Sequence, residues 1–203
     1  MAAGQEDASK LDRTPPRLHT GLRKTTQREK SPVSEKILIA YATKSGSTEE
    51  VAEAIAKTFE EEGTPTEVKP AWDAPDPAEY RAVVVGSPLY SGKLLSDAAI
   101  FINRHKEKLV EMPTALFIVC LVMSRPTERS VQKVIRQTRP MVELLRPRDV
   151  GLFAGSLHYK DVGFFNRILL RLMKVPEGDF RNWDTIHRWA REVHAKLTGQ
   201  KPK

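Results

Sequence analysis

The sequence predicts a three-layer α/β domain, in which helices cover both faces of a doubly wound parallel sheet of five strands in the order 2-1-3-4-5. Short apolar runs recur along the chain, as expected for strands that are buried on both faces. Segments of about 12–18 residues with apolar side chains at helical spacing alternate with these runs. Small polar loops follow two of the strands, at the carboxyl ends where doubly wound sheets bind their ligands.

The composition fits one such domain and a tail. The chain has 203 residues, of which 40% are hydrophobic, so it can build a sizeable core. Residues 1–35 are poor in branched apolar side chains and are predicted to form a disordered basic tail, which leaves residues 36–198 for the domain. The single cysteine excludes a disulfide scaffold and a CxxC redox site. Residues 115–123 form the longest apolar stretch, which is too short to span a membrane, so we expect a cytoplasmic protein.

The first half of the domain begins with a buried strand at residues 36–41 and a polar loop at residues 42–48. A helix follows, for which Ser47 and Glu50 are predicted to form a capping box. Gly63 ends this helix, and a short strand is expected at residues 64–69.

The second half repeats the alternation. The remaining strands are predicted at residues 81–86, 114–123 and 150–157, with a loop at residues 86–92. The remaining helices are predicted at residues 94–109, 131–145 and 183–197. We expect Pro140 to interrupt the second of these helices, because proline cannot donate a helical hydrogen bond.

The loop after the first strand has the groups that a phosphate monoester needs. It reads Thr43-Lys44-Ser45-Gly46-Ser47-Thr48 and leads directly into a helix. Hydroxyls, backbone N–H groups and the positive end of the helix dipole then converge on one place. The spacing matches neither a Walker A loop nor a G-x-G-x-x-G loop. The alternative is an ordinary turn from strand to helix.

The loop after the third strand lies beside the first loop in the predicted order. It reads Gly86-Ser87-Pro88-Leu89-Tyr90-Ser91-Gly92, and Tyr90 offers an aromatic face. A plain turn containing proline is the alternative. One loop suited to phosphate beside one suited to a flat ring indicates a mononucleotide with a planar head group.

These two loops resemble those of the flavodoxin family, over about residues 36–198. Within that family the chain is most similar to the flavodoxin-like, menaquinone-dependent protoporphyrinogen oxidases and their uncharacterised relatives. Three segments carry this closer resemblance: Met112-Pro113 before the strand that reaches Met123, residues 154–159 (AGSLHY) before an aromatic, basic insert, and residues 179–183 (DFRNW) before the last helix.

The resemblance implies FMN as the cofactor. It assigns the phosphate of FMN to Thr43, Lys44, Ser45, Gly46, Ser47 and Thr48. It assigns the isoalloxazine ring to Ser87, Pro88, Leu89, Tyr90, Ser91 and Gly92, with Leu121, Val122 and Met123 on the other side of the ring. Two departures matter: the Trp and Tyr that sandwich the ring in many flavodoxins are not both apparent, and this chain is basic, whereas the family's electron carriers are acidic.

The positive charge is concentrated in the second half of the chain. The net charge is +7 overall, but it is +2 over residues 1–35, −4 over residues 36–123 and +9 over residues 124–203. A basic environment favours the anionic reduced flavin, so we expect an acceptor of electrons from an organic substrate. The arginines of this half could also indicate nucleic-acid binding, but no nucleic-acid-binding module is recognisable, and no nucleic-acid partner is expected.

An insert at about residues 159–178 combines an apolar stripe with Arg167 and Arg171 on one basic stripe. Such a helix either lies on an anionic membrane, here the inner face of the cell membrane, or packs on the sheet with a solvated basic edge. By resemblance the insert borders the substrate side of the flavin. The candidates there are Tyr159, Lys160, Arg167 and Arg171, with His158 as a proton relay or as a surface histidine.

The leading functional hypothesis is therefore an FMN-dependent oxidoreductase. By resemblance, its substrate is protoporphyrinogen IX and its electron acceptor is a quinone. The alternatives are a non-enzymatic electron carrier of the flavodoxin type and an interaction module that has the fold but no flavin. No metal site is expected, and the sequence leaves the oligomeric state open.

Overall fold

The computed structural model describes residues 34–158, 167–168, 171–172 and 177–200, and all statements below concern these residues. The predictions for residues 1–33, and for most of the insert at 159–178, lie outside them.

The central sheet has the predicted order. Its parallel strands are β1 (Ser34–Tyr41), β2 (Thr66–Pro70), β3 (Tyr80–Tyr90), β5 (Thr114–Val119) and β6 (Val150–Phe153). They lie in the order β2-β1-β3-β5-β6, which is 2-1-3-4-5 when the parallel strands alone are numbered. The predicted fold class is thus confirmed. Two short elements were not predicted: β4 (Lys93–Leu94), which pairs with the end of β3, and the ribbon formed by β7 (Ser156–Leu157) and β8 (Gly178–Asp179).

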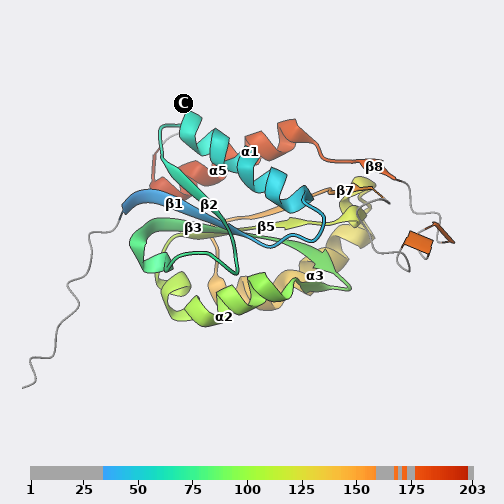
Figure 1. Ribbon diagram of the computed structural model, residues 1–203, viewed down its shortest axis with the longest axis horizontal. Helices are drawn as coiled ribbons and strands as arrows, with labels where there is room; N and C mark the ends of the chain where they lie inside the picture. Colours follow the sequence, from blue (N-terminus) through green and yellow to red (C-terminus); the bar gives the residue numbers. More distant parts are fainter. Residues whose placement is uncertain (1–33, 159–166, 169–170, 173–176, 201–203) are drawn as a thin grey trace, which may run out of the picture. The chain divides into compact units, whose positions relative to one another are not determined.

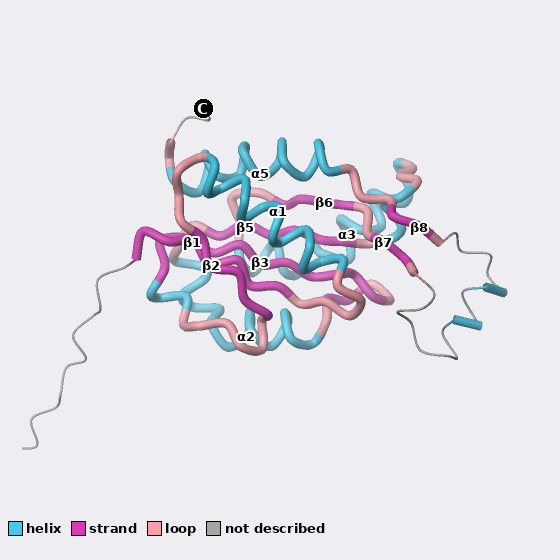
Figure 2. Tube along the Cα trace, turned by 45° about the horizontal axis from the view of Figure 1, so that its top comes forward, coloured by secondary structure: helices cyan, strands magenta, loops and turns pink. Residues whose placement is uncertain are grey.

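Helices cover both faces of the sheet (Figure 1). On one face lie α1 (Ser47–Glu61) and α5 (Trp183–Thr198); on the other lie α2 (Ser96–Glu111) and α3 (Glu128–Leu145). Figure 2 shows the two helical layers from a second direction. Alternate residues of β1 point to opposite faces, so Ile37 and Ile39 pack beneath α1 and α5, whereas Leu38 and Ala40 pack beneath α2 and α3. This division explains the unbroken apolar run of the first strand.

Close packing inside the sheet fixes one glycine. Gly86 of β3 lies opposite Phe117 of β5, and a Cβ atom at Gly86 would come within 2.0 Å of the Phe117 ring. Any larger residue would therefore displace the aromatic ring from the core. Gly86 is the first residue of the second predicted loop.

Several predicted boundaries were wrong. The segment 86–92 is mostly strand: β3 continues to Tyr90, and only Ser91 and Gly92 form the turn into β4. The strand predicted at 114–123 ends at Val119, and residues 121–124 form a 3₁₀ turn, η2. The strand predicted at 150–157 ends at Phe153, and its last two residues form β7 in a separate ribbon. An apolar run shows that residues are buried but not which strand they pair with.

Two predicted helix features were also wrong. Helix α3 continues through Pro140 instead of breaking there. The capping box at α1 does not form, because Gly46 is the N-cap residue and has no side chain to accept a hydrogen bond. Instead, the amide of Gly46 donates to Thr43 Oγ1 at 3.0 Å, and Glu50 is left to contact Arg181.

Candidate functional site

A pocket opens at the carboxyl ends of β1, β3 and β5, where the two predicted loops meet. Residues from four segments of the chain line it. The first loop contributes Thr43, Lys44, Ser45, Ser47 and Thr48; the second contributes Pro88, Leu89, Tyr90 and Ser91. The ends of β5 and β6 contribute Val119, Cys120, Leu121, Val122, Gly155, Ser156, Leu157 and His158. The structure therefore brings the two loops together, as their places in the strand order require.

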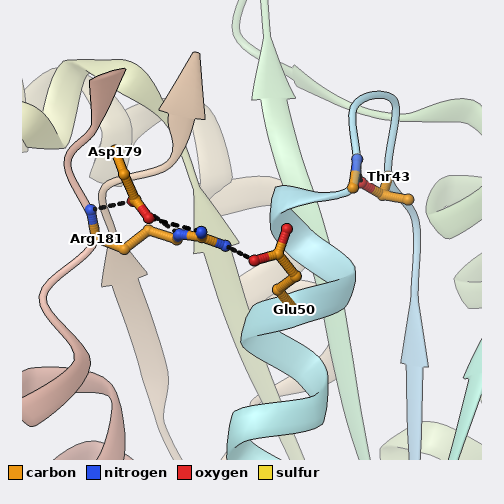
Figure 3. Close-up of polar contacts among 5 residues, drawn as sticks. Thr43, Glu50, Asp179 and Arg181 are labelled. Carbon is orange, nitrogen blue, oxygen red and sulfur yellow. Dashed lines mark hydrogen bonds and ion pairs between the residues drawn. The ribbon is translucent and has the colours of Figure 1, made fainter. Parts of the chain in front are cut away.

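The first loop turns sharply into helix α1. Gly46 has φ = +86°, a left-handed conformation that glycine adopts without strain. The turn is held by the hydrogen bond from the Gly46 amide to Thr43, and Figure 3 shows this loop above the start of α1. The first amides of an α-helix have no partner within the helix, so this end of α1 offers N–H donors and a positive dipole.

Thr48 is the side chain of this loop that most clearly indicates a bound ligand. It is fully buried, it lines the pocket, and its hydroxyl has no hydrogen-bond partner among the described residues. An unpaired buried hydroxyl costs free energy unless a bound group satisfies it. The hydroxyl is thus placed to bond a phosphate oxygen beside the amides of the helix end. The residues present fit a phosphate monoester.

The other wall is apolar and aromatic. Tyr90 is 44% exposed at the rim, with the ammonium group of Lys44 5.3 Å from the centre of its ring. Desolvation by partial burial raises the pKa of Tyr90 above its ordinary value. Leu89 and Val122 extend the apolar surface toward helix α3.

Four of the residues expected to bind the cofactor do not line this pocket. Gly46 contributes only its backbone turn. The hydroxyl of Ser87 is buried away from the pocket, where it donates to the carbonyl of Pro88 and accepts from the amide of Leu95. Gly92 lies beside Gln137 of α3, and Met123 packs against the cluster of Ile118, Cys120 and Val134.

Three pocket residues of the segment after β6, namely Gly155, Ser156 and Leu157, were not predicted from the sequence. Gly155 passes so close to the first loop that a Cβ atom there would lie 3.0 Å from Val119 and 3.6 Å from Ser47 Oγ. Cys120 also faces the pocket, and burial raises the pKa of its thiol. A glycine inside the predicted strand at residues 150–157 could have indicated this close approach, but the segment was predicted as one continuous strand.

The last wall is the β7–β8 ribbon, which one arginine joins to helix α1. Arg181 contacts Asp179 of β8 at 2.7 Å and Glu50 of α1 at 2.8 Å, as Figure 3 shows. The Arg181 guanidinium also lies over the ring of Trp183, at 4.5 Å. Its hydrogen bonds hold the pKa of Asp179 below the usual range, and the nearby His158 acts in the same direction.

His158 follows β7 directly and lines the pocket from an exposed position. It is the only one of the insert-side candidates that the pocket includes among the described residues. Tyr159 and Lys160 lie outside the described residues; Arg167 and Arg171 are in helical conformation, and Arg171 is exposed.

Comparison with known proteins identifies the family of the chain. Residues 38–184 match the family described as the flavodoxin domain. The chain belongs to the flavodoxin domain family. FMN is its cofactor.

Curated relatives of this flavodoxin domain carry names that state an activity. The chain is 28% identical over 180 residues to protoporphyrinogen IX dehydrogenase [quinone] of Escherichia coli K12, which covers 80% of this chain and 96% of the relative. It is 28% identical over 179 residues to the protein of the same name from Leishmania major, which covers 80% of this chain and 76% of that relative.

Solved structures confirm the fold of the flavodoxin domain. Flavodoxin 1 from Bacillus cereus superposes with a TM-score of 0.51 at 18% identity, covering 78% of this chain and 96% of that one. An archaeal flavodoxin superposes with a TM-score of 0.50 at 18% identity, covering 80% and 98% of the two chains. None of the helices in the described part of the chain has both the length and the apolar character of a membrane span.

Proposed function

We propose that this flavodoxin domain is an FMN-dependent oxidoreductase that dehydrogenates protoporphyrinogen IX and passes the electrons to a quinone. At the level of the family, the named relatives support an oxidoreductase. The proposal of this substrate rests on a match that extends over 96% of the Escherichia coli relative, and thus over both walls of the pocket.

The phosphate end of the pocket binds and orients the cofactor. We propose that Thr43, Ser45, Ser47 and Thr48 hold the FMN phosphate, with Thr48 supplying a hydroxyl that has no partner among the described residues. Lys44 adds a positive charge near the rim. FMN, once bound, supplies the chemistry of accepting two electrons and a hydrogen from a C–H bond.

The rim is suited to a flat, largely apolar ring. Tyr90 and Val122 are both exposed there, at 44% and 46%, and present an aromatic face and an aliphatic side chain to a ligand. We propose that these two side chains position the isoalloxazine ring and cover it from water. Leu89 and Leu121 complete the apolar surface.

His158 is the proposed proton acceptor. Removal of hydride from the porphyrinogen carbon leaves a cation, and one ring N–H must then lose its proton. The imidazole of His158 lies on the pocket wall, and the carboxylate of Asp179 is close enough to interact electrostatically with it. We propose that an imidazole nitrogen takes this proton and releases it to solvent.

The test is an anaerobic reaction with the FMN-loaded protein. Protoporphyrinogen IX should bleach the visible flavin absorbance, and a quinone added afterwards should restore it. A flavin that the porphyrinogen leaves oxidised, but that a low-potential one-electron donor reduces, would identify an electron carrier instead. In a parallel measurement, His158→Gln should slow bleaching while FMN affinity is unchanged.

A second proposal concerns the helical part of the insert. Leu172 is 75% exposed and Ile168 is 43% exposed, and Arg167 and Arg171 belong to the same segment. We propose that this segment makes peripheral contact with an anionic membrane, where a quinone dissolves.

A further inference from the structure

A shallow groove leaves the cofactor pocket and runs along helix α3. Val122 lines both the pocket and the far end of the groove. The stretch between them is lined by Leu89, Cys120, Val134 and Lys133, so its floor is largely apolar. None of the phosphate-loop residues lines this stretch, and the groove therefore extends from the ring end of the pocket.

Three cations of α3 line the groove. Arg129, Lys133 and Arg136 are spaced i, i+4 and i+7, which places them on one face of the helix, and all three are exposed. The two acidic residues of the helix, Glu128 and Glu143, do not line the groove.

Among the described residues, no acidic side chain pairs with any of these three cations. Within the described part of the chain, the one ion pair of helix α3 joins Arg139 to Glu143. Unpaired cations beside an apolar floor suit a ligand that is flat, largely apolar and anionic at one edge. A neutral quinone would gain nothing from the positive charges.

We propose that this groove binds the carboxylates of the substrate, with Lys133 and Arg136 as the main anchors and Arg129 at the end of the row. This inference rests on the proposed function, because protoporphyrinogen IX carries two propionates on neighbouring pyrroles of a large apolar macrocycle. Cations one helical turn apart match two neighbouring carboxylates. Anchored there, the macrocycle extends over Val122 toward Tyr90 and the ring end of the pocket.

The first test uses a double variant, Lys133→Gln with Arg136→Gln, in the FMN-loaded protein. The KM for protoporphyrinogen IX should rise about tenfold, since two exposed ion pairs are lost. The kcat and the KM for the quinone should stay the same. The matched control, Arg104→Gln with Lys106→Gln, removes two exposed cations from α2 and should leave every constant unchanged.

The dimethyl ester of protoporphyrinogen IX separates charge recognition from shape. Both of its carboxylates are masked, so wild type and double variant should oxidise it with equal KM. Raising the salt concentration should raise the KM of the dicarboxylic acid and leave the KM of the ester unchanged. An equal KM rise for acid and ester in the double variant would overturn the proposal, because it would show a structural effect.

A binding measurement keeps this inference separate from the proposed function. The oxidised dicarboxylate, protoporphyrin IX, is titrated with FMN-loaded protein, and the change in its Soret absorbance gives Kd without turnover. Binding that weakens about tenfold in the double variant, in a protein that does not oxidise the porphyrinogen, supports the groove and overturns the proposed function. Turnover with unchanged KM and Kd supports the function and overturns the groove. If wild type neither binds nor turns over, both fail.

Binding of single-stranded nucleic acid that depends on Lys133 and Arg136, with none of protoporphyrin IX, would overturn the proposal in favour of a nucleic-acid partner.

Discussion

Arg181 Nη1 lies 2.8 Å from Glu50 Oε2 and joins the first turn of helix α1 to the β7–β8 ribbon. The same guanidinium contacts Asp179 of β8, whose backbone pairs with Ser156 of β7. Helix α1 starts at the phosphate loop, and β7 is a wall of the pocket. Arg181 therefore links the loop that we propose to hold the phosphate to the wall that carries His158.

Arg181→Gln should separate these two walls. The side chain of Arg181 is only 7% exposed, and the variant loses its charged hydrogen bonds to Glu50 and Asp179, each of which contributes about 1.5–3 kcal/mol. We expect FMN affinity to fall about tenfold or more, measured by the quenching of FMN fluorescence. The FMN affinity of Arg181→Lys should lie between those of wild type and Arg181→Gln, because one ammonium group cannot reproduce a guanidinium that pairs with two carboxylates.

The matched control is Arg188→Gln. Arg188 is exposed on α5 and makes one long hydrogen bond, 3.3 Å to Thr185 Oγ1. Its loss should leave FMN affinity unchanged. Equal affinities in Arg181→Gln and wild type would show that the ribbon keeps its place without this bridge.

How much of this site the sequence could predict depends on the range of each signal. The loop at Thr43–Thr48 is predicted by a local pattern, namely small polar residues between a buried strand and a helix. Its place at the pocket was predicted. Glu50 shows the opposite case. Its position three residues after Ser47 suggested a capping box, but the chain places Gly46 at the cap and turns Glu50 toward an arginine 131 residues away. Local pattern favoured one partner, and tertiary structure supplied another.

The same limit explains the strand errors. Residues 150–157 are apolar enough for one strand, yet Gly155 must pass within contact of Val119, and the backbone leaves the sheet after Phe153. The groove along α3 was missed for a related reason. In the sequence, Arg129 and Lys133 cannot be distinguished from ordinary exposed cations. Only the fold shows that they lie beside Val122 at the mouth of the pocket.

Acid should weaken the contact between strand β6 and helix α5. Asp149, just before β6, accepts hydrogen bonds from Trp189 Nε1 at 3.0 Å and from Lys196. Burial alone would raise the pKa of Asp149, but the bonds from Lys196 and Trp189 outweigh it and hold the pKa below the usual range. A carboxyl with a depressed folded-state pKa stabilises the fold above its unfolded pKa of about 3.9, and this contribution disappears as the pH falls through the folded value.

Asp149→Asn removes the charge and should cost about 1–3 kcal/mol in urea unfolding at pH 7. The difference from wild type should shrink as the pH falls below about 4, since the unfolded chain then takes up a proton at Asp149 while the folded chain does so only at lower pH. A difference that is constant from pH 7 to pH 3 would contradict this account, because it would show that the charge of Asp149 does not stabilise the fold.

Membrane contact through the insert predicts a loss of vesicle binding on charge reversal. Arg167→Glu with Arg171→Glu should reduce co-sedimentation with vesicles rich in phosphatidylglycerol, because each cation at the surface contributes about 1 kcal/mol. Vesicles of neutral lipid should bind neither protein well. Arg104→Glu with Lys106→Glu changes the net charge equally on helix α2 and serves as the control. The same loss in both variants would assign binding to net charge and not to the insert.

Thr48 gives the sharpest test of the phosphate loop. Thr48→Val keeps the shape of the side chain and removes a hydroxyl that has no partner among the described residues. The protein without FMN should therefore be as stable as wild type or more stable, because a buried unsatisfied group has been removed. FMN affinity should fall about 10- to 100-fold, the effect of one hydrogen bond to a charged phosphate.

Thr58→Val supplies the opposite pattern on the same helix. Thr58 is equally buried, but its hydroxyl donates to the carbonyl of Ala54 at 3.0 Å and contacts His187 Nδ1 at 2.8 Å. Its loss should cost about 1–3 kcal/mol in urea unfolding and leave FMN affinity unchanged, since Thr58 does not line the pocket. If Thr48→Val also destabilised the FMN-free protein and left FMN affinity unchanged, the hydroxyl would serve the fold, and the phosphate would have to bind elsewhere.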